Sequence, residues 1–146
     1  MTPDDILSAK PQQLDIWCAE VMGWKQVRWS NSFVSRMHGI KPPLRGWMPI
    51  QSPTSDPAGA WNLMLELIEG GLRSKYGVDV IEIVCRLDAK IFLSVHIRRS
   101  SPTDVSSATA YCERHEHSDI SIRLRIALAR AVCLWAFETG RLPITE

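Results

Sequence analysis

Two runs of alternating apolar residues in the middle of the chain constrain its fold more than any other feature. Successive side chains of a β-strand point to opposite faces, so a period of two is typical of a strand with one buried face. A short polar connection, Asp88-Ala89-Lys90, separates the runs, and the pattern predicts an antiparallel hairpin over residues 78–97. The apolar positions on one face of each run are Ile81, Ile83, Cys85 and Leu87, then Ile91, Leu93, Val95 and Ile97.

A well-marked helix start precedes this hairpin. Asp56 is a good N-cap, because its carboxylate can accept hydrogen bonds from the free backbone N–H groups of the first turn. Pro57 fits the first helical position, and Gly70 and Gly71 supply a C-terminal stop. Apolar residues at spacings of three and four predict one buried face, made of Ala60, Trp61, Met64, Leu65, Ile68 and Leu72.

Helices are also predicted at both ends of the chain. Thr2 and Pro3 mark the start of a short helix, and a second one begins at Pro11 and ends near Gly23. A polar loop over residues 98–107 and a third strand over residues 108–112 follow the hairpin. The last helix is expected from Ser118 or Asp119 to about Thr139, with Gly140 as its stop.

This order of elements predicts an α+β fold: a small, mostly antiparallel β-sheet covered by α-helices on both faces, an α/β/α sandwich. The 146 residues are expected to form a single domain, 1–146. A net charge of +1 argues against a nucleic-acid polymer as partner. No apolar run approaches the roughly 20 residues that span a bilayer. The N-terminus lacks a signal pattern, so we expect a cytoplasmic protein with no membrane partner.

Three blocks of the sequence, taken in order, resemble a family of small bacteriophage proteins with the phage ABA-sandwich domain. The blocks are Val21-Met22-Gly23-Trp24, then Ser55-Asp56 with Ala58, Ala60 and Trp61, and last the alanine-punctuated run Ile126 to Ala131. The chain departs from the family between sheet and last helix, where residues 111–117 replace small residues and a glutamate–threonine pair. The resemblance implies helices on both faces of an antiparallel sheet and a phage origin. It brings no catalytic motif.

Candidate ligand-binding residues lie in two places. Residues 24–49 resist assignment to regular structure and carry Trp24, Trp29 and Trp47 beside arginines. An aromatic ring can stack on a nucleobase while a guanidinium binds phosphate. The start of the helix at Asp56 is the second place, since free N–H groups there favour an anion. The candidates are Arg28, Arg45, Trp47, Thr54, Ser55, Asp56 and Arg98. The alternative is that these tryptophans form an interface or cover a sheet edge, whereas Trp17, Trp61 and Trp135 are expected in the core.

Neither metal chemistry nor catalysis is predicted. Cys112, His115 and His117 are of zinc-ligand type, but a fourth ligand is not evident, and a solvated turn explains them better. No nucleophile elbow or glycine-rich phosphate loop occurs, and no catalytic residue or cofactor is expected. The cysteines, Cys18, Cys85, Cys112 and Cys133, lie in apolar segments without paired spacing and are expected to be buried free thiols.

The resulting hypothesis is a phage-encoded, non-enzymatic binding protein that counters host defence by sequestering a small nucleotide-derived immune signal. Edge strands and surplus tryptophans indicate a homo-oligomer. One alternative is a protein-interaction module that inhibits a host defence protein directly. A phosphodiesterase or nuclease with an unfamiliar site is a further alternative.

Overall fold

The computed structural model describes residues 2–30, 36–68, 80–86, 92–100, 105–113, 116 and 119–138. Four helices and six strands lie in this part of the chain. The helices are α1 (Pro3–Leu7), α2 (Pro11–Val21), α3 (Pro57–Ile68) and α5 (Ile120–Glu138). The strands are β1 (Lys25–Ser30), β2 (Arg36–Ile40), β3 (Met48–Ile50), β4 (Val80–Arg86), β5 (Phe92–Ser100) and β6 (Val105–Glu113).

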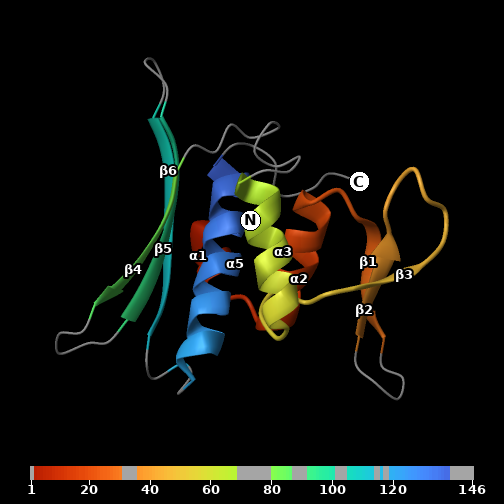
Figure 1. The fold of residues 1–146 in the computed structure, drawn as a ribbon, viewed down its shortest axis with the longest axis horizontal. Coiled ribbons are helices and arrows are strands. Elements are labelled where there is room, and N and C mark those ends of the chain that lie inside the picture. The colour runs from red at the N-terminus through yellow and green to blue at the C-terminus, as the bar shows by residue number, and fades with distance from the viewer. Residues whose placement is uncertain are drawn as a thin grey trace.

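The fold is α+β, as the sequence predicts, but its layers differ from the expected order. Two three-stranded antiparallel sheets are present, β1-β2-β3 and β4-β5-β6. The described helices lie between them, so that the order is sheet, helices, sheet (Figure 1). The single sheet covered on both faces was expected because residues 24–49 lack a clear strand period. Their strands are short and interrupted, yet they pair into a sheet of their own.

The predicted hairpin is confirmed. Its register pairs Ile81 with Ile97, Ile83 with Val95 and Cys85 with Leu93. β6 extends the sheet on the other side of β5 and begins at Val105, so the expected loop over residues 98–107 is largely strand. Ala110 of β6 is fully buried in the core cluster that includes α5. This sheet therefore covers one side of the last helix.

The predicted helix starts are confirmed in their hydrogen bonds. Thr2 and Asp5 form a reciprocal capping box at α1. Asp56 Oδ1 accepts from the backbone N–H of Ala58 at 2.9 Å, and Asp119 Oδ1 accepts from that of Ser121 at 2.8 Å. The predicted stops at Gly70, Gly71 and Gly140 lie outside the described residues.

The core is built around α5, which lies between other elements over much of its length. Every residue from Ile126 to Ala136 is buried. Small alanines at four of these positions let neighbouring backbones approach closely. Leu14 and Cys18 of α2 and Leu63 of α3 complete the same cluster. In all, four elements of the middle layer and β6 share one core.

The three tryptophans expected in the core differ in their burial. Trp135 is buried and Trp17 packs half-buried against the core. Trp61 is 60% exposed, so its prediction was wrong. Ala60 and Leu63 are the buried α3 residues of the core, and Leu63 is two positions from Trp61, which is about 200° around a helix. Trp61 therefore projects away from the core, because α3 is covered along one side.

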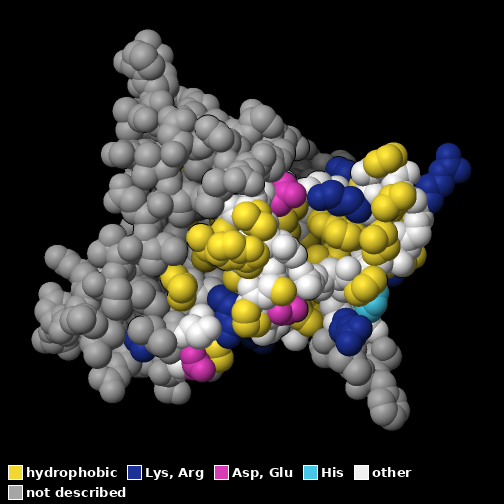
Figure 2. Space-filling model, viewed as in Figure 1, with side chains coloured by type: hydrophobic (Ala, Val, Ile, Leu, Met, Phe, Trp, Pro, Cys, Tyr) yellow, Lys and Arg dark blue, Asp and Glu magenta, His cyan; other side chains and the backbone are white. Residues whose placement is uncertain are grey.

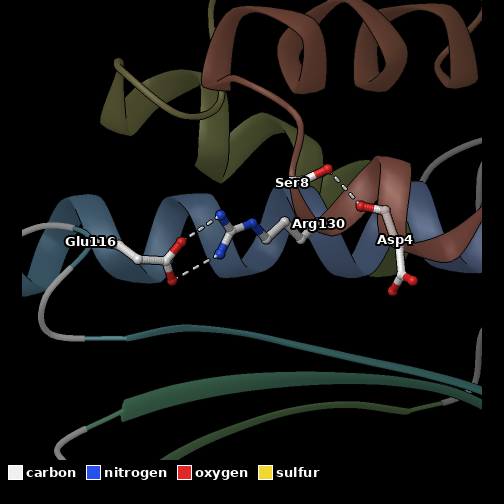
Figure 3. Close-up of polar contacts among 4 residues, drawn as sticks. All are labelled: Asp4, Ser8, Glu116 and Arg130. Carbon is white, nitrogen blue, oxygen red and sulfur yellow. Dashed lines mark hydrogen bonds and ion pairs between the residues drawn. The ribbon is translucent and has the colours of Figure 1, made fainter.

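A partly buried ion pair joins α5 to Glu116, in the segment that precedes it. The Arg130 guanidinium donates to both carboxylate oxygens of Glu116, at 2.7 and 3.2 Å (Figure 3). Bidentate pairs of this kind are among the stronger charged hydrogen bonds. Ser8 Oγ, which donates to the Asp4 carbonyl at 2.7 Å, ends α1 nearby.

Cys18 and Cys133 are buried free thiols, as predicted, with their sulfurs 3.8 Å apart. The burial of Cys85 and Cys112 lies outside what the structure describes. Within the described ranges, no helix is long and apolar enough to cross a membrane.

Candidate functional site

A groove of about 900 Å³ lies between the first sheet and α3. We call it the sheet–helix groove. Its sheet wall consists of Trp24, Trp29, Arg36, Lys41 and Met48, with neighbouring residues of β2 and β3. Its helix wall consists of Ser55, Asp56, Asn62, Leu65 and Glu66. Residues Gln51 and Ser52, which connect β3 to α3, line the groove between the two walls.

The connection between β3 and α3 is hydrogen-bonded to Asp15. This α2 carboxylate is 1% exposed and accepts hydrogen bonds from Ser52 Oγ, from the Thr54 backbone N–H at 3.0 Å and from Thr54 Oγ1 at 2.8 Å. Burial raises the pKa of Asp15, and the three hydrogen bonds offset only part of that effect. Asp15 therefore positions the start of the helix wall.

Sequence reasoning missed Asp15, although a signal for it exists. It stands three and four positions before Cys18 and Ala19, which are apolar and buried, and directly after buried Leu14. A carboxylate at that spacing lies on the buried face of an amphipathic helix, where it needs donors. Ser52 and Thr54 are those donors.

The helix wall is packed tightly against the same connection. Ser55 Oγ donates to Ser52 Oγ at 2.7 Å, and Ser52 Oγ in turn donates to Asp15. A Cβ added at Gly59 would lie 2.7 Å from the Ser52 carbonyl carbon and oxygen, so no larger residue fits without a shift. The first turn of α3 thus lies directly against the Ser52 backbone.

The sheet wall presents two partly buried indole rings. Trp24 and Trp29 pack against a small core of Ala19, Met37 and Ile50. Trp29 Nε1 donates to the Gln12 carbonyl at 3.2 Å, which fixes the orientation of its ring. Lys41 Nζ donates to the Met22 carbonyl at 2.6 Å and lies 5.5 Å from the centre of the Trp24 ring.

The predicted site residues separate into three groups. Ser55 and Asp56 line the groove. Thr54 is buried beside it, and its hydroxyl and backbone N–H both donate to Asp15. Arg28, Arg45 and Trp47 lie outside the groove lining, and Arg98 belongs to a strand of the other sheet.

These four residues lie elsewhere for identifiable reasons. The Arg28 guanidinium stacks over the Trp47 ring, 4.7 Å from its centre, so the two form a pair of their own. Arg45 is exposed in the connection before β3. Arg98 belongs to β5, in the other sheet. Sequence adjacency of arginine and tryptophan did not reveal which side of the sheet each residue occupies.

The groove contains cations that sequence reasoning passed over, Arg36 and Lys41. Counting the charged residues in each segment of the sequence could have identified these two cations. Residues 21–55 contain five lysines and arginines and no aspartate or glutamate, although the whole chain has a net charge of only +1. The sheet wall is therefore basic, and Asp56 and Glu66 make the helix wall acidic.

The arrangement offers ring faces, cations, hydroxyls and carboxylates to a ligand in one open groove. Within the described residues, no group of three or more His, Cys, Asp and Glu is placed to hold a metal ion. His115 and His117, which are of zinc-ligand type but were expected in a solvated turn, lie outside those residues.

No protein-family model and no curated protein matches the chain. The resemblance to phage ABA-sandwich proteins therefore stays a prediction from the three sequence blocks.

Proposed function

We propose that the chain is a non-enzymatic binding protein whose sheet–helix groove holds a small nucleotide-like ligand. The observation that carries this proposal is the pairing of a basic, tryptophan-bearing wall with a hydroxyl- and carboxylate-bearing wall across one groove. Its volume of about 900 Å³ is within the range of small-molecule sites.

Each wall suits a different part of such a ligand. The exposed rim residue Arg36 is a good partner for phosphate, because a guanidinium binds phosphate oxygens bidentately. Trp24 and Trp29 offer apolar ring surface to a base. Asp56 accepts one backbone N–H through Oδ1, and a ribose hydroxyl could donate to its other oxygen.

The biological setting of this proposal comes from the sequence resemblance. A phage protein that holds a nucleotide-derived immune signal in the host cytoplasm would lower its free concentration and counter host defence. Sequestration of this kind requires tight binding and no turnover.

Isothermal titration calorimetry of the full chain with cyclic nucleotides and ADP-ribose tests the proposal. We expect binding by the wild-type protein and at least about tenfold weaker binding by Arg36→Ala, since a charged hydrogen bond contributes roughly 1.5–3 kcal/mol. Lys10→Ala, which removes one positive charge at an exposed position outside the groove lining, is the matched control and should bind like wild type. Folded protein that binds none of these ligands would overturn the proposal. Recovery of hydrolysed ligand would instead identify a phosphodiesterase.

A second candidate function rests on exposed aromatic surface. Trp47 and Trp61 are 47% and 60% exposed, and solvent-exposed tryptophans are common at protein interfaces. These side chains favour direct inhibition of a host defence protein. A pull-down from host lysate separates the two functions, because sequestration of a small ligand needs no protein partner.

A further inference from the structure

The exposed apolar side chains lie on both sides of the sheet–helix groove. Trp61 and Leu65 are four positions apart on α3, so they share one helix face, and they are 60% and 38% exposed. Across the groove, the lining residue Met48 is 37% exposed. Figure 2 shows hydrophobic side chains gathered over α3 and again over the first sheet. Together they form an apolar surface interrupted by the groove.

The two sides of this surface carry opposite charge. Residues 21–55, which form the first sheet, have five lysines and arginines and no acidic residue. Residues 56–72, which include α3, have three aspartates and glutamates and no lysine or arginine. Arg36 lines the groove on the sheet side and Glu66 lines it on the helix side.

We infer that this face is the contact surface between two copies of the chain, with α3 of one copy against the first sheet of the other. A two-fold interface must be complementary to itself, because the same patch meets its own copy. An acidic half beside a basic half meets that requirement when the partner is rotated by two-fold symmetry. Each acidic α3 then meets the partner's basic sheet, and both Trp61 side chains leave water.

Such a dimer would also close the groove. Trp61 and Leu65 lie beside Asn62 and Glu66 of the helix wall, so a copy seated on that face covers the groove opening. This part of the inference rests on the proposed function, whereas the dimer itself does not. A covered groove excludes water and slows ligand release, which sequestration requires.

Sedimentation velocity of the full chain over a concentration series tests the interface. We expect a dimer, and we expect Trp61→Ser to weaken dimerisation at least about tenfold, as is typical when a central interface tryptophan is truncated. Since Trp61 is outside the core, far-UV circular dichroism should show an unchanged fold. A wild-type chain that stays monomeric throughout, or a Trp61→Ser chain that dimerises as wild type does, would overturn the inference.

Charge reversal provides a second measurement. Arg36→Glu and Glu66→Lys should each weaken the dimer, and the double variant should recover it at least in part. Lys10→Glu is the matched control, because Lys10 is exposed and its side chain caps nothing at α2. Dimers insensitive to both reversals would count against charge pairing at this face.

The outcome for the ligand is separable. Nucleotide binding by a wild-type monomer would overturn the dimer and leave the proposed function standing. A dimer that depends on Trp61 but binds no nucleotide would support the dimer interface and overturn the proposed function.

Discussion

Thr54 donates two hydrogen bonds to the buried carboxylate of Asp15, one from its backbone N–H at 3.0 Å and one from its hydroxyl at 2.8 Å. This contact joins α2 to the connection between β3 and α3, and it decides where the helix wall of the groove begins. Three donors converge on this one buried carboxylate, so the effect of removing it on stability should be measurable.

Replacing Asp15 with Ala should destabilise the protein by about 3 kcal/mol, because Ser52 and Thr54 would be left with unsatisfied buried donors. Asp15→Asn should cost less, since the amide oxygen can still accept and the hydroxyls can turn. Urea unfolding followed by circular dichroism measures both. Asp4→Ala, at an exposed position, is the control and should change stability little. Equal stability of Asp15→Ala and wild type would contradict the role assigned to this carboxylate.

The same residue predicts a pH dependence. Burial raises the pKa of Asp15 above its usual 3.8 in the folded protein. As pH rises, the unfolded chain loses this proton first, so the folded state binds more protons in the window above 3.8. The contribution of Asp15 to the free energy of unfolding therefore falls as pH rises through that window.

The comparison that isolates this effect is wild type against Asp15→Asn, unfolded with urea at several values from about pH 3.5 to about pH 6. The difference in stability between the two should shift in favour of the variant as pH rises. The comparison with Asp15→Asn is needed because carboxyl groups whose pKa is lowered by folding make the free energy of unfolding rise with pH. Hydrogen bonds from Thr2, for example, lower the pKa of Asp5. A difference that is constant with pH would refute the prediction.

Local signals in the sequence predicted the helices and the hairpin well, because capping and alternation depend on neighbouring residues. Asp56, Asp119 and the pairing of Ile83 with Val95 are examples. The first sheet was missed because its strands are as short as the three residues Met48–Ile50 and are held by pairing between distant segments.

The site was predicted in part for the same reason. Ser55 and Asp56 were found because a helix start is a local signal. Arg36 and Arg28 are alike in sequence surroundings, yet one lines the groove and the other stacks on Trp47. The register places both residues on one face of the first sheet, because Arg28 pairs with His38 and Arg36 pairs with Ser30, two positions further along each strand. They differ in their place along the strands, which is set by pairing between segments that are distant in the sequence.

Gly59→Ala should destabilise the protein by about 2 kcal/mol, the usual cost of forcing an extra carbon into a packed site. The new Cβ would lie 2.7 Å from the Ser52 carbonyl group, so α3 or the connection before it must move. Gly46→Ala is the matched control, because a Cβ there meets nothing within 4 Å. Thermal unfolding of the two variants beside wild type measures the difference. If both glycines tolerate alanine equally, the close approach of α3 to Ser52 is incorrect.

Cys18 and Cys133 should resist alkylation in the folded protein. Their sulfurs are 3.8 Å apart and fully buried, and the hydrogen bond between them, with burial, raises the pKa of Cys18 well above its usual value. Since the thiolate is the reactive form, both exclusion of reagent and the raised pKa oppose reaction. Treatment with iodoacetamide and peptide mass spectrometry should find the two residues unmodified in native buffer and modified in urea. Rapid native labelling of Cys18 would show that α2 separates from α5, and would contradict the core in which these helices share one buried contact.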